Sequence, residues 1–566
     1  MRRFDLALSA AALMVLSGAS LARGDSPAPP EAQVDAIMKS HGVGAMTGPG
    51  CAISITRAGA VLMAKGYGAA DIEHGVPFGL DTVSETGSVA KQVTAAAILM
   101  LAEQGRLSLD DDVHKYLPEL PDYGAKVRLY NLLHHTSGIR EWATIAALRG
   151  YPRFNRKAYS MADFFKLVSA QRTLNFAPGE RYQYSNSNYG LLSIIVGRVS
   201  GMSAAQFGAS RLFGPLGMSA TQWRDDMRRV VPRRATAYRS AGQGFEQAMP
   251  FEDVYGHGGL LTTVGDLQLW NKALLGGGLS PYVAQHMLER GKLSDGETRD
   301  YAGGIFVTTY RGHRVYRHGG NTAGYAAQLW SFPDDRISIA LLCNARVGEA
   351  DIAVQAADVA LGLAPAPRAA KAAAGAPPPD KGAVSYFKSA HGELVAIKAQ
   401  GGARSINLFT GGGFKPVRDG AEPGEATVAD DFGVGELRFD GSDRIKAWVD
   451  THDATLFVRM PAAKPSRGDL AGRYWSADLG TAYAIHRKAG GYRMELADAG
   501  ADIPLAFDLQ WLNGDTYLAH VDDKTGNFRN DLIATFTPGR RRLFLSSVLD
   551  LQGVDDLAFT RQGPAR

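Results

Sequence analysis

The chain has 566 residues, and at about 150 residues per domain this length predicts three to four domains. Hydrophobic residues make up 45% of the chain and charged residues 21%, a composition typical of globular proteins that excludes a largely disordered chain. Lysine and arginine number 61 against 57 aspartates and glutamates, so the net charge is only +4. This balance, without a strongly basic run, argues against a nucleic-acid partner.

The N-terminus has the pattern of a secretory signal. Two adjacent arginines precede the apolar run Leu6–Leu16, and the small residues Ser20 and Ala22 follow it. This pattern predicts a signal peptide over residues 1–22 and a periplasmic or secreted protein. The apolar core is too short to span a bilayer, and no later stretch is long enough, so no membrane span is expected in the mature protein.

Motifs for metals and cofactors are missing from the sequence. The two cysteines, Cys51 and Cys343, are too few for a disulfide scaffold or a cysteine-based metal cluster. His134-His135 is predicted to take part in helix packing rather than in a metal site. There is neither an H-E-x-x-H motif nor a Walker lysine motif. Neither a metal nor a cofactor is therefore expected.

Residues 364–380, APAPRAAKAAAGAPPPD, separate two regions of different character. Proline and alanine dominate this stretch, which predicts a linker. Before it, residues 23–363 mix helical and strand patterns, with strand pairs at CAISITRAG/AVLMAKGYGAA and AAQLWSFP/ISIALLCNA. Helices are predicted at Glu31–His41, Val89–Gly105, Leu129–His135, Ala162–Ser169, Tyr189–Ser200 and Val264–Leu275.

The region after residue 380 consists of short runs of alternating residues, such as LVAIKA, GELRFD and ATLFVRM. These runs predict an antiparallel barrel or sandwich. A break at 461–469 divides the region into 381–462 and 468–566. GELVAI and GTAYAI, each followed by a Gly-Gly pair, recur at an offset of 88 to 89 residues. The repeat favours two similar units, although two unrelated hairpins would give the same pattern.

The first chemical motif is Ser88-Val89-Ala90-Lys91, at the start of a predicted buried helix. A spacing of three residues places the serine and the lysine on one helical face. The helix dipole and burial both lower the pKa of a lysine there, so Lys91 is expected to relay a proton from Ser88. Taken by itself, Ser88 fits a helix cap equally well, and Ser385-Tyr386-Phe387-Lys388 has the same spacing.

The second motif is Tyr184-Ser185-Asn186. In an extended loop, residues two apart face the same way, so Tyr184 and Asn186 are expected to point into one cleft. A phenol with a pKa near 10 needs a nearby cation, such as Lys91, to act as a base. Asn186 can hold both a lysine and a substrate amide. The alternative is a polar loop that caps the following helix.

The third motif is His318-Gly319-Gly320, followed by Asn321 and a predicted strand. Glycines on a strand that lines a cleft allow a substrate backbone to approach closely. A donor from this strand could complete an oxyanion hole. His257-Gly258-Gly259 has the same pattern, but the helix that follows it indicates a structural turn, so the order of motif and strand favours His318.

Together and in this order, the three motifs resemble those of the serine β-lactamase and penicillin-binding-protein-like hydrolases. The branch most similar contains class C β-lactamases, DD-carboxypeptidases, D-aminopeptidases and family VIII esterases. The resemblance covers about residues 30–360 and includes LYNLLHHTSGI, YSNSNYGLLSIIVGRVSG and GGLLTTVGDL. It implies an α/β, three-layer β-lactamase-like catalytic domain, in which helices flank an antiparallel sheet. The paired β regions resemble the D-aminopeptidase layout and imply C-terminal antiparallel β-barrel-like domains.

The resemblance also implies a role for each motif. Y-S-N and H-G-G stand where class A enzymes have S-D-N and K-T-G, so efficient β-lactam hydrolysis is not expected. The backbone N–H groups of Ser88 and Asn321 would form the oxyanion hole. The implied catalytic residues are the nucleophile Ser88, its proton partner Lys91 and the general base Tyr184, and the implied substrate-binding residues are Asn186, His318, Gly320 and Asn321.

The activity that the resemblance implies is that of an exported serine hydrolase acting through an acyl-enzyme on D-amino-acid-containing peptides or amides. A carboxylesterase of the same fold is one alternative. A non-turnover module that binds β-lactams or cell wall is another. The expected partner is a small peptide, amide or ester substrate, and the sequence does not set the oligomeric state.

Two further expectations come from the resemblance. Its sheet places the first and last strands side by side, which implies that Cys51 and Cys343 are neighbours, either as a disulfide or as two buried apolar residues. The D-aminopeptidase layout implies that a barrel loop shapes the mouth of the active site. Gly411–Gly413 and Asn513–Asp515 are the candidate loops, and a stabilising or wall-docking module is the alternative.

Overall fold

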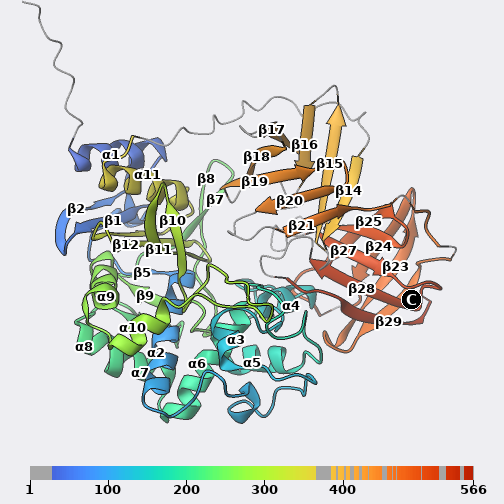
Figure 1. Ribbon diagram of the computed structural model, residues 1–566, viewed down its shortest axis with the longest axis horizontal. Helices are drawn as coiled ribbons and strands as arrows, with labels where there is room; N and C mark the ends of the chain where they lie inside the picture. Colours follow the sequence, from blue (N-terminus) through green and yellow to red (C-terminus); the bar gives the residue numbers. More distant parts are fainter. Residues whose placement is uncertain are drawn as a thin grey trace, which may run out of the picture.

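The computed structural model describes residues 29–364 without a break and most of the chain after residue 383 (Figure 1). The predicted signal peptide and all but the first residue of the predicted linker lie outside the described residues. After residue 383, the described ranges are 384–389, 393–400, 403–407, 414–419, 424–430, 433–448, 455–461, 463–466, 468–498, 500–521, 531–547 and 553–564.

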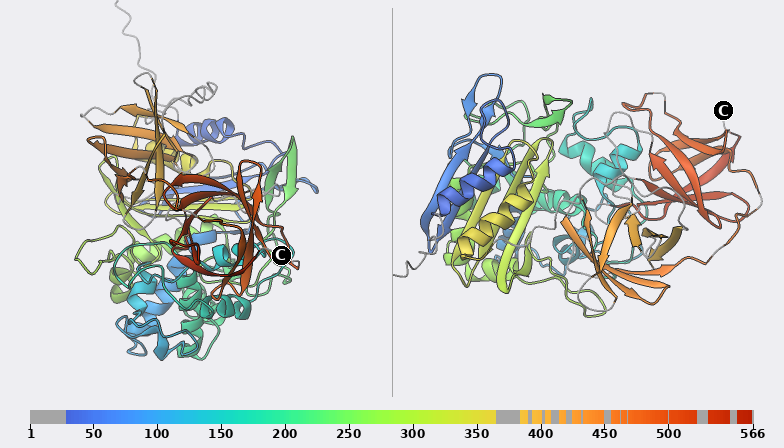
Figure 2. Two further views of the ribbon diagram at one scale, coloured as in Figure 1. Left: turned by 90° about the vertical axis from the view of Figure 1, so that its right-hand side faces the viewer. Right: turned by 90° about the horizontal axis from the view of Figure 1, so that it is seen from above.

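The first part of the chain forms three layers around a six-stranded antiparallel sheet with the order β10-β11-β12-β13-β1-β2. Helices α1 and α11 cover one face (Figure 2), whereas α9 and the 3₁₀ turn η1 that leads into α2 contact the other. The predicted α/β three-layer fold is therefore confirmed. The elements are β1 Cys51–Arg57, β2 Ala60–Tyr67, β10 Phe306–Tyr310, β11 His313–Thr322, β12 Tyr325–Phe332, β13 Ile337–Cys343, α1 Pro30–Ser40, η1 Gly87–Ala90, α2 Lys91–Glu103, α9 Val264–Gly276 and α11 Glu349–Leu361.

The remaining elements of this part are short. The helices and helical turns are η2 Val113–Lys115, α3 Leu129–Leu133, α4 Trp142–Leu148, α5 Met161–Ser169, α6 Asn186–Ser200, α7 Ala204–Gly208, η3 Ala209–Phe213, α8 Gly214–Leu216 and α10 Pro281–Met287. The strands are β3 Ala69–Asp71, β4 Val76–Pro77, β5 Ser84–Glu85, β6 Gln222–Trp223, β7 Tyr238–Ala241, β8 Gly244–Gln247 and β9 Leu260–Thr262.

All six predicted helices occur, as α1, α2, α3, α5, α6 and α9. Helices α4 and α10 were not predicted, because their seven residues each span only two turns and show little periodicity. Helix α11 was not predicted either. Among the described residues, no single helix is long and apolar enough to cross a membrane. Asn186–Ser200 and Ala204–Leu216 meet that criterion only as a pair bent by 78°.

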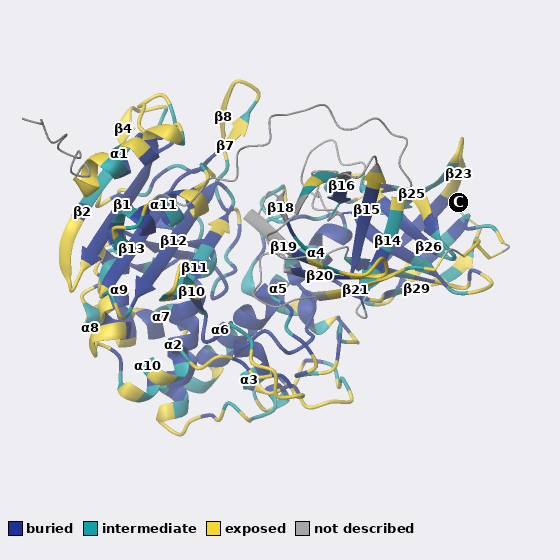
Figure 3. Ribbon diagram, turned by 45° about the horizontal axis from the view of Figure 1, so that its top comes forward, coloured by how far each residue is buried: buried dark blue, intermediate teal, exposed yellow. Residues whose placement is uncertain are grey.

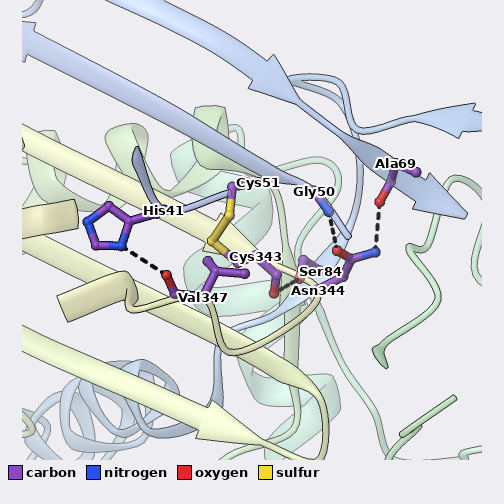
Figure 4. The surroundings of a disulfide bond; sticks show 8 residues. All are labelled: His41, Gly50, Cys51, Ala69, Ser84, Cys343, Asn344 and Val347. Carbon is purple, nitrogen blue, oxygen red and sulfur yellow. Dashed lines mark hydrogen bonds between the residues drawn. A yellow bond between two sulfur atoms is a disulfide. The ribbon is translucent and has the colours of Figure 1, made fainter. Parts of the chain in front are cut away.

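The two predicted strand pairs form, and a disulfide joins one pair to the other. Ala58 and Gly59 turn the β1–β2 hairpin with φ angles of 51° and 82°, as a tight hairpin turn requires. On its other side β1 pairs with β13, which places Cys51 directly opposite Cys343. The two cysteines are bonded, with Cα atoms 4.0 Å apart (Figure 4). The expectation that the two cysteines are neighbours is confirmed, and of its two alternatives the disulfide is the one observed.

The C-terminal region contains two closed antiparallel barrels of eight strands each, which confirms the barrel-like architecture. β15 and β23, which carry the two copies of the sequence repeat, are the second strand of their barrels. The first barrel consists of β14 Val384–Ser389, β15 Leu394–Gln400, β16 Ala403–Asn407, β17 Lys415–Asp419, β18 Glu425–Asp430, β19 Gly433–Asp440, β20 Arg444–Trp448 and β21 Thr455–Arg459. The second consists of β22 Gly472–Ser476, β23 Thr481–Lys488, β24 Gly491–Leu496, β25 Ala506–Asn513, β26 Thr516–Val521, β27 Leu532–Phe536, β28 Arg542–Ser547 and β29 Leu557–Gly563.

The second barrel shares a hydrophobic core with the three-layer domain, and both contain many buried residues, dark blue in Figure 3. The Tyr483 hydroxyl of β23 donates to the carbonyl of Leu148 at 2.7 Å. The backbone of Ile503 donates to the carbonyl of Gly150 at 3.1 Å. Gly150 has a φ of +84°, and a Cβ on it would lie 2.5 Å from the Ala501 Cβ. Only glycine fits this contact, because both the backbone angle and the space exclude a side chain.

Two arginines of the three-layer domain form ion pairs with carboxylates of the second barrel. Arg140 is buried and donates to Asp478 at 2.8 Å. Arg181 pairs with the buried carboxylate of Asp555, which also accepts from Gln183 at 3.1 Å. Because Arg181 and Gln183 precede Tyr184, the barrel holds the segment that leads into the second chemical motif.

The structure describes one of the two candidate mouth loops of the barrels. Asn513–Asp515 holds the segment between the barrels: the Asn513 Oδ1 accepts from the backbone of Ala463 at 2.6 Å, and Asp515 accepts from Ser466 at 2.6 Å. These contacts bind the turn to the inter-barrel segment, and its role at the mouth of the active site stays a prediction. Gly411–Gly413 lies outside the described residues.

The disulfide predicts a redox-dependent stability. It joins residues 292 positions apart, and its loss is expected to lower the free energy of unfolding by about 2–5 kcal/mol. Denaturant unfolding of the wild type with and without reductant measures this difference. A Cys51→Ala, Cys343→Ala double variant serves as the control, because its unfolding should not respond to reductant. A wild type that is equally insensitive would contradict the prediction.

The barrel interface predicts an unequal response to two carboxylate substitutions. Asp555→Ala leaves the Arg181 guanidinium buried without this carboxylate, which should cost about 3–5 kcal/mol of unfolding free energy. Asp498→Ala removes a partly exposed acceptor of the Tyr151 hydroxyl, 3.3 Å away in the same interface, and should cost about 1 kcal/mol or less. Equal losses in thermal or denaturant unfolding would contradict a central role for Asp555.

Candidate active site

Ser88 and Lys91 meet at the junction of η1 and α2. Ser88 lies in the 3₁₀ turn, and Lys91 is the first residue of the α-helix. A 3₁₀ turn has three residues per turn, so positions i and i+3 lie above one another. The Lys91 Nζ is 3.0 Å from the Ser88 Oγ. The local geometry thus brings the two groups into contact more directly than an α-helical turn would.

The Lys91 amine is fully buried and bound on two further sides. It donates to the Asn186 Oδ1 and to the His257 carbonyl, each at 2.7 Å. Burial holds the pKa of Lys91 well below its usual value, although the nearby Glu141 carboxylate opposes the shift. A neutral amine has two N–H donors and one lone pair. The two carbonyl oxygens can only accept, so the lone pair is directed at Ser88.

The Tyr-Ser-Asn motif spans the start of α6. Ser185 is the extended N-cap residue, with φ −139° and ψ 122°, and Asn186 is the first helical residue. The Lys91 Nζ lies 4.7 Å from the centre of the Tyr184 ring. Burial raises the pKa of the Tyr184 phenol far above its usual value, although the nearby Ser88 hydroxyl opposes the shift. Tyr184 is therefore a neutral phenol in the resting site.

His135 supports Tyr184 from behind. It lies two residues beyond the end of α3, with a left-handed φ of 55°. Its ring packs 5.1 Å from that of Tyr189 on α6, in agreement with the predicted helix packing. Its Nδ1 accepts from the Ser185 backbone at 3.2 Å, and its ring lies 4.3 Å from that of Tyr184. Tyr301 packs against both rings. A histidine with positive φ leaves no periodic pattern in the sequence, which is why this contact could not be predicted.

Strand β11 passes directly against the Ser88 turn. A Cβ on Gly320 would lie 2.0 Å from the Thr86 carbonyl oxygen and 2.6 Å from the Ser88 nitrogen. Gly87, with φ +52°, would clash in the same way with the Asn321 nitrogen at 2.5 Å. The two glycines let the turn and the strand touch through their backbones. The backbone nitrogens of Ser88 and Asn321 consequently both lie at this contact.

His318 faces the aromatic cluster next to Tyr184. Its Nδ1 is 2.5 Å from the Gly319 carbonyl, which can only accept, so Nδ1 carries the proton. Its Nε2 therefore accepts from the Tyr301 hydroxyl at 3.2 Å. Burial lowers the pKa of His318 to about 3. His318 is a neutral imidazole at physiological pH.

The second His-Gly-Gly segment also borders the site. Besides the His257 carbonyl on Lys91, the Gly259 backbone donates to the Glu85 Oε1 at 3.2 Å. Glu85 precedes the Ser88 turn and is paired with the buried Arg224 at 2.9 Å. The φ of +80° at Gly259 agrees with the predicted turn. The contact between the His257 carbonyl and Lys91 could not be predicted from the sequence, because every residue has a backbone carbonyl.

All seven sequence-predicted site residues lie around this point, whereas the rival serine motif does not. Ser385 is on β14, and its Oγ accepts from Arg459 at 2.7 Å. Positions three apart on a strand face opposite sides, so Lys388 cannot serve Ser385 as Lys91 serves Ser88. The seven residues are Ser88, Lys91, Tyr184, Asn186, His318, Gly320 and Asn321.

Among the described residues, one group of carboxylate and imidazole side chains lies close enough together to bind a metal ion. Asp71, Glu73 and His74 form this set. His74 Nδ1 lies 3.0 Å from the Asp71 carboxylate, and Glu73 accepts from Gln247 at 2.8 Å. These side chains are bound to one another or to neighbours, which does not indicate a metal-dependent site.

Comparison with known proteins agrees with this geometry. A D-aminopeptidase of Gluconobacter oxydans (strain 621H) is 28% identical over 318 residues, which are 55% of this chain and 59% of that protein. A D-aminopeptidase of Brucella melitensis biotype 2 is 27% identical over 453 residues, or 79% and 82%. An octameric penicillin-binding protein homologue from Pyrococcus abyssi has a similar fold, with a TM-score of 0.54 and 22% identity over 76% of this chain and 99% of that chain.

The sequence profile of the Beta-lactamase family matches residues 38–364. This is more than half of the chain, and it contains the nucleophile turn, the start of α6 and the β11 segment that meet at the site. The relatives and the fold point the same way. The chain belongs to the beta-lactamase family and is a serine hydrolase.

Proposed function

We propose that the protein is an exported serine hydrolase that forms an acyl-enzyme on Ser88 and acts on D-amino-acid-containing peptides or amides. The observation that carries the proposal is the buried Lys91 amine, 3.0 Å from the Ser88 Oγ and held by two carbonyl acceptors. A serine is a weak nucleophile until a base takes its proton. The amine lone pair is placed to do this.

Acylation begins when the Ser88 Oγ attacks the substrate carbonyl carbon. The Oγ–H bond breaks, the proton bonds to the Lys91 nitrogen, and the carbonyl electron pair moves onto oxygen. The N–H groups of Ser88 and Asn321 are the proposed oxyanion hole, where the negative charge develops. Asn186 holds Lys91 through its Oδ1 and is the proposed contact for the substrate amide.

Collapse of the tetrahedral intermediate requires a proton on the leaving amine. The neutral Tyr184 phenol, beside both Ser88 and Lys91, is the proposed relay: its O–H gives a proton to the amine nitrogen as Lys91 returns one to the phenol oxygen. Water then attacks the acyl carbonyl carbon and gives a proton to Lys91. The bond between the acyl carbon and the Ser88 Oγ breaks, Lys91 returns the proton to the Ser88 Oγ, and the carboxylic acid is released. Tyr184 thus acts as a relay rather than as the resting base that the resemblance implied.

The substrate class rests on the relatives. Two curated D-aminopeptidases are 27% and 28% identical to this chain, and the longer match extends over 79% of it. Export rests on the predicted signal peptide and on the Cys51–Cys343 disulfide, because such bonds persist mainly outside the reducing cytoplasm. Cleavage after Ala22 is tested by the N-terminal sequence of the secreted protein.

Substitution of the two serine motifs is expected to give opposite results. Ser88→Ala should remove covalent labelling by a fluorophosphonate and lower turnover by roughly 10⁴-fold or more. Ser385→Ala, at the matched motif on β14, should leave both unchanged. Active-site labelling and steady-state kinetics measure the effects. Loss of labelling in Ser385→Ala instead would overturn the assignment of the nucleophile.

A substrate panel tests the substrate class. The mature protein should hydrolyse D-alanyl p-nitroanilide faster than its L-enantiomer and faster than nitrocefin. D-Ala-D-Ala peptides and p-nitrophenyl esters complete the panel, with Ser88→Ala as the background control. A preference for esters without selection of the D-enantiomer would favour a carboxylesterase. Rapid labelling by a fluorescent penicillin without turnover of any substrate would favour a binding module.

A further inference from the structure

A buried carboxylate lies directly behind the Lys91 site. Glu141 is the N-cap residue of α4, and its Oε1 accepts from the backbone of Ala143 at 3.3 Å. Its side chain points toward α6, and no more than 1% of the residue is exposed. A helix cap alone does not require burial, because caps on exposed helices can be satisfied beside water. The position of Glu141 therefore suggests a second purpose.

Glu141 binds both the backbone and the side-chain amide of Asn186. The Oε2 accepts from the Asn186 backbone at 2.5 Å, and the Oε1 accepts from the Asn186 Nδ2 at 3.3 Å. Three N–H groups thus point at the two oxygens, which favours the ionised carboxylate. Burial raises the pKa of Glu141, whereas the Asn186 donors and the charge of Arg153 oppose that rise.

This contact fixes which end of the Asn186 amide meets Lys91. A carboxylate can bind only the Nδ2 end of the amide, so the Oδ1 end must face away from Glu141. The Oδ1 is the atom that accepts from the Lys91 Nζ at 2.7 Å. With one amine hydrogen on Asn186 and one on the His257 carbonyl, the lone pair is left for Ser88. Glu141 determines this direction without touching Lys91 or Ser88.

Glu141 also supplies negative charge close to the amine. The titratable or charged groups that face Lys91 are Glu141, Arg153, His135, His257, His318, Tyr184 and Tyr189. Burial keeps the three histidines neutral by lowering their pKa values. Arg153 is paired with Glu252. Glu141 is consequently the carboxylate positioned to oppose the positive charge that appears when Lys91 takes the proton of Ser88.

We infer that Glu141 is a positioning residue for hydrolysis: acting through Asn186, it directs the Lys91 amine at Ser88 and stabilises the ammonium that forms during acylation. The arrangement parallels a Ser-His-Asp triad, in which a buried carboxylate orients the base and stabilises its protonated form. Here an asparagine amide stands between the carboxylate and the base. The inference rests on the proposed function, in which Lys91 accepts the proton of Ser88.

Glu141→Gln removes the charge at nearly constant volume and is the main test. The rate of acylation by a fluorophosphonate should fall by about 10²-fold. Loss of the negative charge lowers the pKa of Lys91, so the acidic limb of the acylation pH profile should move to lower pH. A purely structural role would reduce the folded fraction but would not move this limb. An unchanged limb therefore overturns the inference, whatever happens to the rate.

Two further variants complete the test. Asp163→Asn removes the carboxylate that caps the neighbouring helix α5 and should leave the profile unchanged. Glu141→Asp keeps the charge with a shorter reach, so its rate should fall while its acidic limb stays at the wild-type position. It decides the question if Glu141→Gln does not fold, since a shifted limb in Glu141→Asp would overturn the inference. If Ser88→Ala still acylates, the proposed function itself fails, which is distinguishable from failure of the Glu141 inference alone.

Discussion

The removal of the Lys91 amine from water is the constraint on which the rest of the site depends. A charged ammonium is costly in such surroundings unless it is paired, and the groups in contact with this amine are carbonyl oxygens, a hydroxyl and aromatic rings. Burial therefore favours the neutral amine, which is the form that accepts a proton. The same lysine cannot also be the resting cation that lowers the pKa of Tyr184. In the proposed mechanism, this condition makes Lys91 the base and Tyr184 the relay.

Close backbone contacts and the packing of a separate domain keep the elements around the Lys91 amine in place. Gly87 and Gly320 let the nucleophile turn and β11 meet without side chains between them, so both proposed oxyanion donors belong to rigid elements. The second barrel pairs its Asp555 with Arg181, just before Tyr184, and its Asp478 with Arg140, just before Glu141. The barrel thus supports, from outside, the two segments that surround the lysine. In the described residues, the barrel packs against these two segments and fixes their position.

Much of this arrangement was predictable because its signals are local. The Ser88–Lys91 spacing, the apolar helix behind it, the β1–β2 hairpin and the barrel repeats each lie within a short stretch of sequence. The contacts of His257, His135 and Glu141 were not predictable, since they depend on a carbonyl, a left-handed residue and a helix cap brought together by folding. The start of α6 at Asn186 also differs from the expected loop: the helix begins before the apolar pattern does, and the buried Glu141 carboxylate accepts from the backbone of its first residue. The placement of Asn513–Asp515 depends on the inter-barrel segment, which carries no periodic pattern.

The protonation state of Lys91 in the resting enzyme is the most direct test of the account. Selective ¹³C labelling of lysine, with the Lys91 signal assigned by comparison with Lys91→Arg, allows the Cε chemical shift to be followed by NMR from pH 5 to pH 11. The account predicts a neutral amine at pH 7, with a titration far below that of the exposed lysines. A Lys91 signal that stays in the ammonium form up to about pH 10, together with the exposed lysines, would contradict it.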